Sequence, residues 1–301
     1  MPAKIISGTQ IAGQIREDLQ KEIAGLKEKH GVIPGLATIL VGDDPASGIY
    51  VGQKEKSCRN LGIYSKRVDL PAETSEKDLL SIIDKLNKDP QIHGVLVQLP
   101  LPEHIDEYSV ICAIDPDKDV DGFHPVNVGK MMLGKRCFIP CTPHGILELL
   151  LRSNIQTEGA EVVIVGRSNI VGKPILNLML QKRPGGNATV TICHTRTKNL
   201  EFHTKRADIL IAAIGRPKTI SGDMVKEGVV VIDVGVNRVG KTPEGKSILS
   251  GDVDFDSVKE KAAAITPVPG GVGPMTIVML MKNTVEAAFL NRGRKSEVRE
   301  Q

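Results

Sequence analysis

The sequence has no tryptophan, and all aromatic residues together make up only 3% of it. Its net charge at neutral pH is a modest +3, and no basic stripe runs through the body of the chain. Proteins that bind nucleic acid need a concentrated basic surface, and often aromatic platforms on which bases stack. We therefore expect no nucleic-acid partner. The one basic stretch is the C-terminal tail, 293–301, which we predict to be disordered.

Long apolar runs are also missing. No segment approaches the roughly 20 residues of a membrane span, and the opening MPAKIISG lacks the apolar stretch of a secretion signal. The five cysteines are odd in number and irregularly spaced, which suits reduced thiols. Cys137 and Cys141 lie four residues apart, but no second ligand pair follows, so we expect no zinc or other metal. These absences together predict a cytoplasmic protein with no membrane partner.

The composition that remains is that of a globular protein, with 41% hydrophobic and 25% charged residues over 301 positions, enough for two domains. Helical and strand patterns alternate along the chain, which predicts the α/β class with parallel sheets. In the first half we expect helices at 9–29, 46–61 and 75–88, and strands at 35–42, 64–70 and 93–100.

The second half follows an expected helix at 142–153, where Thr142 and Pro143 have the residue types of an N-cap and a first-turn proline. Continuous apolar runs then predict strands that are buried on both faces of a doubly wound, Rossmann-like parallel sheet. These strands are expected at 161–166, 188–194, 208–215 and 229–235, with a hairpin at 237–253 and a last short strand before a helix at 277–290.

We predict two domains with a cleft between them. Residues 1–145 would form an α/β catalytic domain, and residues 146–274 a dinucleotide-binding domain. The final helix has nothing of its own to pack on in the second half. We therefore expect residues 275–292 to return to the first domain and complete it.

A dinucleotide site is expected where the strand at 161–166 runs into GRSNIVGKP and then into an apolar helix. The glycines at 166 and 172 give the pattern GxSxxxG rather than GxGxxG, so the motif alone is weak. The prediction of a dinucleotide site therefore depends on the buried strand before this turn and on the parallel strands expected around it. Amides at the helix N-terminus would favour a phosphate there.

An acidic residue is missing where the second strand of this domain ends, in CHTRT. NAD enzymes usually carry one there to bind the ribose 2′-hydroxyl. Thr195 and Arg196 stand in its place, with Arg167 and Ser168 in the first turn, and two guanidinium groups and two hydroxyls suit a 2′-phosphate. We therefore predict NADP as the cofactor. Taken singly, each arginine could instead be a solvated surface residue.

Tyr50 and Lys54 are candidates for a reactive pair, because they lie four residues apart on the helix expected after DDPAS and so share a face. A core tyrosine beside an exposed lysine is the alternative. Gln98 and Leu99 stand where the strand at 93–100 ends, at the rim on which open α/β sheets bind ligands.

Two further segments have residues suited to a ligand. KDVDGF, at 118–123, places Asp119 and Asp121 in a turn, where a carboxylate can cap the turn or hold an aminopyrimidine by paired hydrogen bonds. TPVPGGVGPMT, at 266–276, has three glycines and three prolines. Such a segment can hold an unusual backbone path against a ligand, or can be a rigid hinge.

Five motifs in order, YVGQK, GVLVQLPLP, KDVDGF, GRSNIVGKP and TPVPGGVGPMT, resemble the bifunctional methylenetetrahydrofolate dehydrogenase/cyclohydrolase family over nearly the whole chain. The resemblance implies the free-standing two-domain form, with no third domain, and a homodimer. It also implies NADP-dependent oxidation of 5,10-methylenetetrahydrofolate to 5,10-methenyltetrahydrofolate, then hydrolysis to 10-formyltetrahydrofolate. These are steps of one-carbon metabolism that supply purine biosynthesis.

By this resemblance Lys54 is the main catalytic residue, Tyr50 positions the folate, Gln98 tunes Lys54 and Asp121 grips the pterin. A partly desolvated lysine beside a cationic substrate is expected to have a lowered pKa, which suits proton transfer between water and a ring nitrogen. The other expected contacts are Val97, Leu99, Pro269, Gly270 and Gly271 for folate, and Gly166, Arg167, Ser168, Thr195, Arg196, Val236 and Thr276 for NADP.

Two positions depart mildly from the family's usual pattern, with Thr195 in place of a serine and Val236 in place of an isoleucine. The alternatives are two other classes of dehydrogenase and a sensor. An amino-acid dehydrogenase would need carboxylate-binding groups around its lysine, and a short-chain dehydrogenase would place the Tyr–Lys pair after its glycine turn, whereas Tyr50 precedes Gly166. An NADP-binding sensor without turnover stays open at this point.

Overall fold

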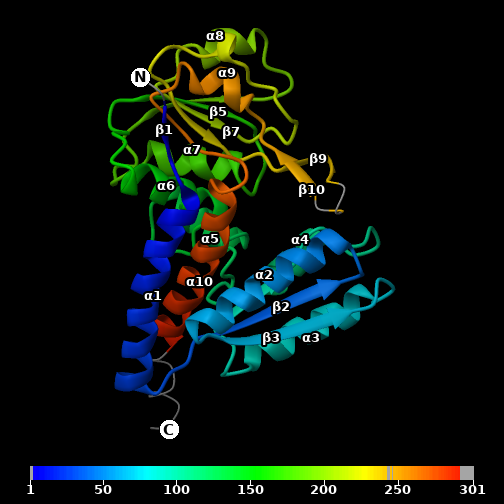
Figure 1. Ribbon diagram of the computed structural model, residues 1–301. Helices are drawn as coiled ribbons and strands as arrows, with labels where there is room; N and C mark the ends of the chain where they lie inside the picture. The colour runs from blue at the N-terminus through cyan, green and yellow to red at the C-terminus, as the bar shows by residue number, and fades with distance from the viewer. Residues whose placement is uncertain (1–2, 243–244, 246, 292–301) are drawn as a thin grey trace. The chain divides into compact units, whose positions relative to one another are not determined.

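The computed structural model describes residues 3–242, 245 and 247–291 (Figure 1). The predicted disordered tail, 293–301, lies outside the described residues. The chain divides into two compact units. We call them the three-stranded unit, Gln14–Ile139 with Ile277–Gln301, and the six-stranded unit, Met1–Gly13 with Pro140–Thr276. The boundaries fall within two helices, α1 (Gly8–His30) and α10 (Val272–Asn291).

The three-stranded unit is built on a parallel sheet of order β3-β2-β4. The central strand β2 (Gly35–Val41) is buried along its whole length, which explains its continuous apolar sequence. It lies between β3 (Tyr64–Leu70) and β4 (Gly94–Val97). The other helices of the unit are α2 (Pro45–Leu61), α3 (Glu76–Lys88), α4 (Glu107–Ala113) and α5 (Pro125–Met132).

The start of α2 is fixed by the DDPAS turn. The Asp44 carboxylate accepts a hydrogen bond from the Ser47 amide at 2.7 Å, and Pro45 occupies the first turn, where its missing N–H costs nothing. The helix ends at Gly62 in the left-handed conformation, with φ 74°. Start and end together define the extent of α2, the helix that carries Tyr50 and Lys54.

The six-stranded unit has a fully parallel sheet of order β1-β11-β8-β7-β5-β6. From β5 the chain goes out to β6, then back across to β7 and on to β8. Right-handed crossovers in opposite directions place helices on opposite faces, and Figure 1 shows α8 and α9 on one face and α6 and α7 on the other. The doubly wound prediction is confirmed. The strands are β1 (Lys4–Ile5), β5 (Glu161–Val165), β6 (Thr189–Cys193), β7 (Ile209–Ala212), β8 (Val230–Asp233) and β11 (Ala264–Ile265), and the helices are α6 (Cys141–Arg152), α7 (Gly172–Leu180), α8 (Leu200–Thr204) and α9 (Phe255–Lys259).

The expected hairpin is present as an antiparallel pair, β9 (Asn237–Lys241) and β10 (Ser247–Ser250). Each buried strand of the six-stranded sheet also lies within its predicted range. These strands are predictable because burial on both faces forces an unbroken apolar sequence.

Several predicted bounds differ from the structure. Residues 1–13 were expected in the first domain, but β1 pairs with β11 and brings them into the six-stranded unit. The expected boundary at 145 lies at 139. Pro140, not Thr142, is the N-cap of α6. Helix α10 begins at Val272 rather than 277, so the last residues of TPVPGGVGPMT are helical.

Among the residues that the structure describes, no helix combines the length and the apolar character needed to cross a membrane. In the same part of the chain, no three His, Cys, Asp or Glu side chains gather so that they could hold a metal ion. Cys141, one of the two cysteines considered as a zinc pair, is a buried residue at the start of α6.

Candidate functional site

A lysine and a glutamine meet at the carboxyl edge of the three-stranded sheet. The Lys54 ammonium on α2 donates a hydrogen bond to Oε1 of Gln98 at 2.9 Å. Gln98 is held in turn, because its side-chain amide donates to the carbonyl of Leu99 at 2.7 Å and its backbone amide donates to the carbonyl of Ile39 at 2.8 Å. The neutral amide of Gln98 thus orients the half-buried amine of Lys54.

Tyr50 lies one helical turn before Lys54 on α2, with 43% of its surface exposed. It is therefore not the buried core tyrosine of the alternative interpretation. The structure places Tyr50 and Lys54 on one face, as the spacing predicted, with Gln98 against the lysine. A half-buried amine, a phenol and an amide at one sheet edge can position a polar substrate and move a proton.

The KDVDGF turn separates the roles of its two carboxylates. Asp119 is 2% exposed, and burial raises its pKa to about 6, with the charge of Asp121 adding to the rise. Asp121 is half-buried and lies at the surface of a hollow. The Asp119 carboxylate accepts hydrogen bonds at 2.8 to 3.2 Å from the backbone amides of Gly122, Phe123 and His124 and from the side chain of Asn127. Asp119 thus caps the turn, whereas Asp121 lines the hollow.

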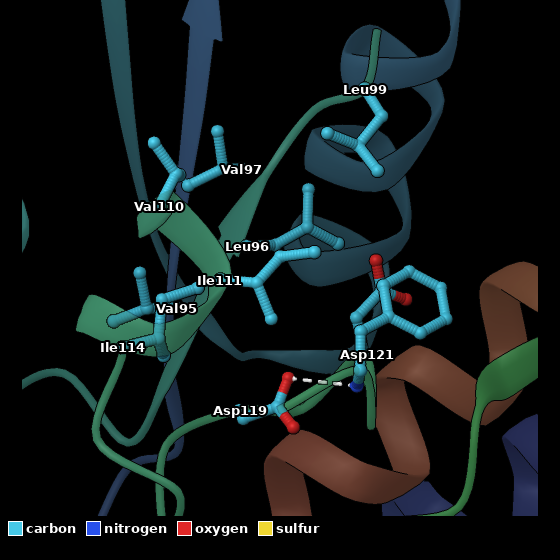
Figure 2. A pocket seen from close by; sticks show the side chains of 10 residues that line it. Val95, Leu96, Val97, Leu99, Val110, Ile111, Ile114, Asp119 and Asp121 are labelled. Atoms are coloured by element: carbon cyan, nitrogen blue, oxygen red, sulfur yellow. Dashed lines mark hydrogen bonds between the residues drawn. The ribbon is translucent and has the colours of Figure 1, made fainter. Parts of the chain in front are cut away.

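A small hollow that is open to solvent lies beside Asp121. Figure 2 shows aliphatic side chains from β4 and α4 around it, with the two carboxylates at one end. The buried aliphatic residues of the hollow belong to the core of the unit, whereas Leu99, Ile111, Asp121 and Phe123 are half-buried and can contact a ligand that presents N–H donors. Three of the predicted substrate residues line it, namely Val97, Leu99 and Asp121, together with Val95, Leu96, Val110, Ile111, Ile114, Asp119 and Phe123.

Sequence reasoning missed a buried polar side chain that holds this turn. Asn283 on α10 is 1% exposed, and its amide donates hydrogen bonds to the carbonyls of Val120 at 2.8 Å and Ile139 at 3.0 Å. The C-terminal helix therefore anchors the backbone next to Asp121. The signal in the sequence was a single asparagine inside a strongly apolar helix.

The predicted dinucleotide turn follows β5 in the six-stranded unit. Gly166 has φ 136°, and a Cβ there would lie 2.0 Å from the carbonyl oxygen of Ala213. A Cβ on Gly172 would lie 2.1 Å from the carbonyl oxygen of Gly166. The Ser168 hydroxyl accepts from the amides of Val171 at 3.1 Å and Gly172 at 3.3 Å. Both glycines are thus sterically required, and the turn leads into the N-terminus of α7 as a phosphate site needs.

Four exposed side chains stand at the carboxyl ends of the neighbouring strands β5 and β6: Arg167, Ser168, Thr195 and Arg196. The two strands are in register at this edge, where the Gly166 amide donates to the carbonyl of Cys193 at 2.9 Å. Ser168 can still donate its hydroxyl proton while it accepts the two capping bonds. Two guanidinium groups and two hydroxyls thus follow the ends of two neighbouring strands.

The remaining predicted contacts are in the six-stranded unit. Val236, 46% exposed, follows β8. The Thr276 hydroxyl, in the first turns of α10, is 2.9 Å from the Thr142 hydroxyl. Gly270 has φ 103°, and its carbonyl accepts a hydrogen bond from the Thr9 amide at 3.0 Å. Gly271 packs so closely that a Cβ would lie 2.5 Å from the carbonyl oxygen of Pro267. The loop at Pro269 therefore has one fixed backbone path, while its contact with folate stays a prediction.

Two family models match the chain. Residues 6–121 match the tetrahydrofolate dehydrogenase/cyclohydrolase catalytic domain, and residues 140–292 match the NAD(P)-binding domain of the same family. The "Bifunctional protein FolD" of Dehalococcoides mccartyi is 65% identical over 288 residues, which cover 96% of this chain and 97% of that protein. The protein of the same name from Syntrophus aciditrophicus is 65% identical over 293 residues, or 97% of this chain and 100% of that protein.

Solved structures agree with these matches. A bifunctional methylenetetrahydrofolate dehydrogenase/cyclohydrolase from Campylobacter jejuni is 46% identical, with a TM-score of 0.90 over 96% of this chain and 99% of that one. The corresponding enzyme of Trypanosoma brucei, solved with NADP cofactor and an inhibitor, is 37% identical, with a TM-score of 0.91 over 97% of this chain and 99% of that one.

Proposed function

Because the chain belongs to the tetrahydrofolate dehydrogenase/cyclohydrolase family, we propose roles for its residues in the two reactions of a bifunctional enzyme. The protein oxidises 5,10-methylenetetrahydrofolate to 5,10-methenyltetrahydrofolate with NADP and hydrolyses the product to 10-formyltetrahydrofolate. The observation that carries the assignment of residues is the Lys54–Gln98 hydrogen bond beside the hollow that Asp121 borders.

In the oxidation, the enzyme's main task is alignment. When bound, NADP supplies the hydride acceptor. Asp121 holds the amino group and ring N–H of the pterin by paired hydrogen bonds, and the half-buried side chains of Leu99, Ile111 and Phe123 contact the ring. Tyr50 supports the rest of the folate from α2. Pro269, Gly270 and Gly271 are proposed to complete the folate site, and Thr276 the cofactor site.

In the hydrolysis, Lys54 moves the proton. A water that attacks the methenyl carbon must lose a proton, and a ring nitrogen must gain one as the ring opens. The Lys54 amine can do both in turn, because Gln98 holds it in place through a neutral oxygen. Gln98 thus acts on Lys54 rather than on the substrate's reacting atoms.

The cofactor preference follows from the charges at the ends of β5 and β6. Arg167 and Arg196 bind the 2′-phosphate of NADP, and the hydroxyls of Ser168 and Thr195 add hydrogen bonds. Arg196→Glu is expected to lower the ratio of kcat/KM for NADP to that for NAD at least tenfold, because it replaces attraction by repulsion. Steady-state kinetics with both cofactors measures this ratio, and an unchanged ratio would remove Arg196 from the site.

A substitution of Lys54 tests the assignment directly. Lys54→Met is expected to reduce cyclohydrolase activity by 10²-fold or more, the usual loss when a general acid–base group is removed. Lys56→Met, on the exposed side of the same helix, is the matched control and should keep full activity. The measurement is the decay of methenyl-folate absorbance. Retention of most of the activity in Lys54→Met would remove the lysine from its assigned role.

The location and the oligomeric state of the enzyme are also proposed. We expect a cytoplasmic homodimer whose product feeds purine biosynthesis, as the family resemblance implies. Strand β3 lies at the edge of the three-stranded sheet, and no strand within the described residues pairs with its outer side, so a strand of a second copy could pair there. Light scattering of the purified protein measures the mass in solution, and a monomer at micromolar concentration would contradict the dimer.

A further inference from the structure

Two carboxylates are buried at the carboxyl edge of the six-stranded sheet and belong to none of the motifs considered above. Asp233 is the last residue of β8 and is 4% exposed, and Asp252 follows β10 and is fully buried. Buried carboxylates are costly unless hydrogen bonds satisfy them. The partners of these two therefore tell what they hold in place.

Asp233 fixes the backbone around Asp252. Its carboxylate accepts hydrogen bonds from the backbone amides of Asp252 at 2.9 Å and Val253 at 3.0 Å, and from that of Gly235 at 3.0 Å. A Cβ on Gly251 would lie 1.8 Å from Oδ2 of Asp233, so only glycine fits beside it. The segment 251–253 is thus clamped to the end of β8.

Asp252 in turn holds the loop that follows β7. Its carboxylate accepts from three consecutive backbone amides, those of Ile214 at 2.5 Å, Gly215 at 2.9 Å and Arg216 at 3.0 Å. Three successive N–H groups aimed at one point form a nest that binds an anion, and here the anion is a side chain. Asn237, the first residue of β9, donates a fourth hydrogen bond at 2.8 Å.

The loop after β8 is fitted around the same carboxylate. A Cβ on Gly235 would lie 2.2 Å from Oδ1 of Asp252. Gly235 and Asn237 flank the exposed Val236 and are bonded to Asp233 and Asp252 respectively. The two carboxylates therefore set the positions of both loops, 214–216 and 235–237.

The strand order shows which half of the cofactor these loops face. A dinucleotide lies across the carboxyl ends of the strands at the point where the chain reverses direction, here between β5 and β7. The proposed 2′-phosphate site is at β5 and β6, so the other half of the molecule extends over β7 and β8. The loops held by Asp252 follow these two strands.

We infer that Asp252 is a positioning residue for the nicotinamide half of NADP, acting through the loops 214–216 and 235–237. The inference rests on the proposed placement of the 2′-phosphate at β5 and β6. It predicts that loss of the Asp252 carboxylate weakens binding of the whole dinucleotide but not of its adenosine half.

The experiment compares two ligands, NADP and 2′,5′-ADP, by isothermal titration calorimetry with the full-length protein. For Asp252→Ala we expect the Kd of NADP to rise about tenfold or more, while the Kd of 2′,5′-ADP stays within twofold of the wild-type value. Asp256→Asn is the matched control, since Asp256 lies four residues further on with its side chain 83% exposed, and it should change neither Kd.

Chemical rescue provides a second readout, which a general loss of stability would not produce. Formate can enter the space left by Asp252→Ala and accept from the amides of Ile214, Gly215 and Arg216. We expect formate to restore much of the NADP affinity in this variant and to leave that of the wild-type protein unchanged.

Two results would overturn the inference: an unchanged Kd for NADP in Asp252→Ala, or equal weakening of both ligands without rescue by formate. If Asp252→Ala does not fold, Asn237→Ala is used instead, because it removes one hydrogen bond to Asp252. The Kd of NADP should then rise relative to the Kd of 2′,5′-ADP. Normal binding of both ligands by Asn237→Ala would then count against the inference. Failure of the wild-type protein to bind 2′,5′-ADP would instead contradict the proposed 2′-phosphate site.

Discussion

Asp119 and Asp121 show how two like residues in one turn take different roles. The first is surrounded by four N–H donors and buried, whereas the second is half-buried at the edge of a hollow. The motif KDVDGF predicted a carboxylate that caps or binds, and the structure assigns the cap to Asp119. Sequence alone could not separate them, because the donors come from residues 122–127 folded back onto Asp119.

Substitution of the two aspartates should therefore give opposite results. Asp119→Asn is expected to lower the free energy of unfolding by about 1 to 3 kcal/mol, because an amide NH₂ replaces an acceptor that faces buried donors. Asp121→Asn should change stability by less than about 0.5 kcal/mol and raise the KM for folate at least tenfold. Denaturant unfolding and steady-state kinetics measure the two effects. An unstable Asp121→Asn with normal KM would reverse the assignment.

The backbone of Gly270 changes the test that the sequence suggests for the Gly/Pro loop. Sequence reasoning predicts that Gly270→Val harms folate binding more than stability. With φ 103°, however, a valine there is strained whatever the ligand does. Pro269→Ala is the better variant, because it keeps Gly270 intact, and it should raise the KM for folate while the melting temperature changes little. A lower melting temperature with an unchanged KM would make the loop purely structural.

Among the elements, the central strands and α2 were predictable, and the short or unusual ones were not. Strands β2, β5 and β7 are buried on both faces, so their sequences are continuous apolar runs. The two residues of β1 are too few to show any periodicity. Helix α10 begins inside a glycine- and proline-rich segment, because Pro274 lies in its first turn, where no hydrogen bond is lost.

Helix α10 also supports the proposed folate site through Asn283. Asn283→Ala is expected to raise the KM for folate several-fold, because the carbonyl of Val120 loses the donor that fixes the Asp121 turn. The effect should be smaller in an Asp121→Ala background, since the two residues act on one contact. Leu290→Ala, on the same helix and 40% exposed, is the control. Equal effects in both backgrounds would mean that Asn283 does not act through Asp121.

At the scale of the whole molecule, a buried aspartate with a raised pKa is found in each of the two units, Asp119 in one and Asp233 in the other. Burial brings the pKa of Asp119 and of Asp233 to about 6, against about 3.9 in an unfolded chain. The folded state therefore binds these protons more tightly. Their contribution to stability is complete below about pH 4 and is lost as the pH rises through 6.

The free energy of unfolding should accordingly fall between pH 4 and pH 6 on account of these groups, by up to about 1.4 kcal/mol per pH unit for each. Asp233→Asn removes one of them, so the fall over this range should be shallower in the variant. Urea unfolding at a series of pH values measures the slope. An identical slope in both proteins would mean that Asp233 does not titrate there.

The pairing of β1 with β11 limits the order in which the strands of the six-stranded sheet can pair. Lys4 lies beside Ala264, so the first strand of this sheet to be synthesised is the partner of the last one. Strand β1 must therefore wait until all the other strands of the sheet have been synthesised before its partner exists. Contacts of such long sequence separation form late and slowly, so the growing chain carries β1 without its partner strand until β11 has emerged.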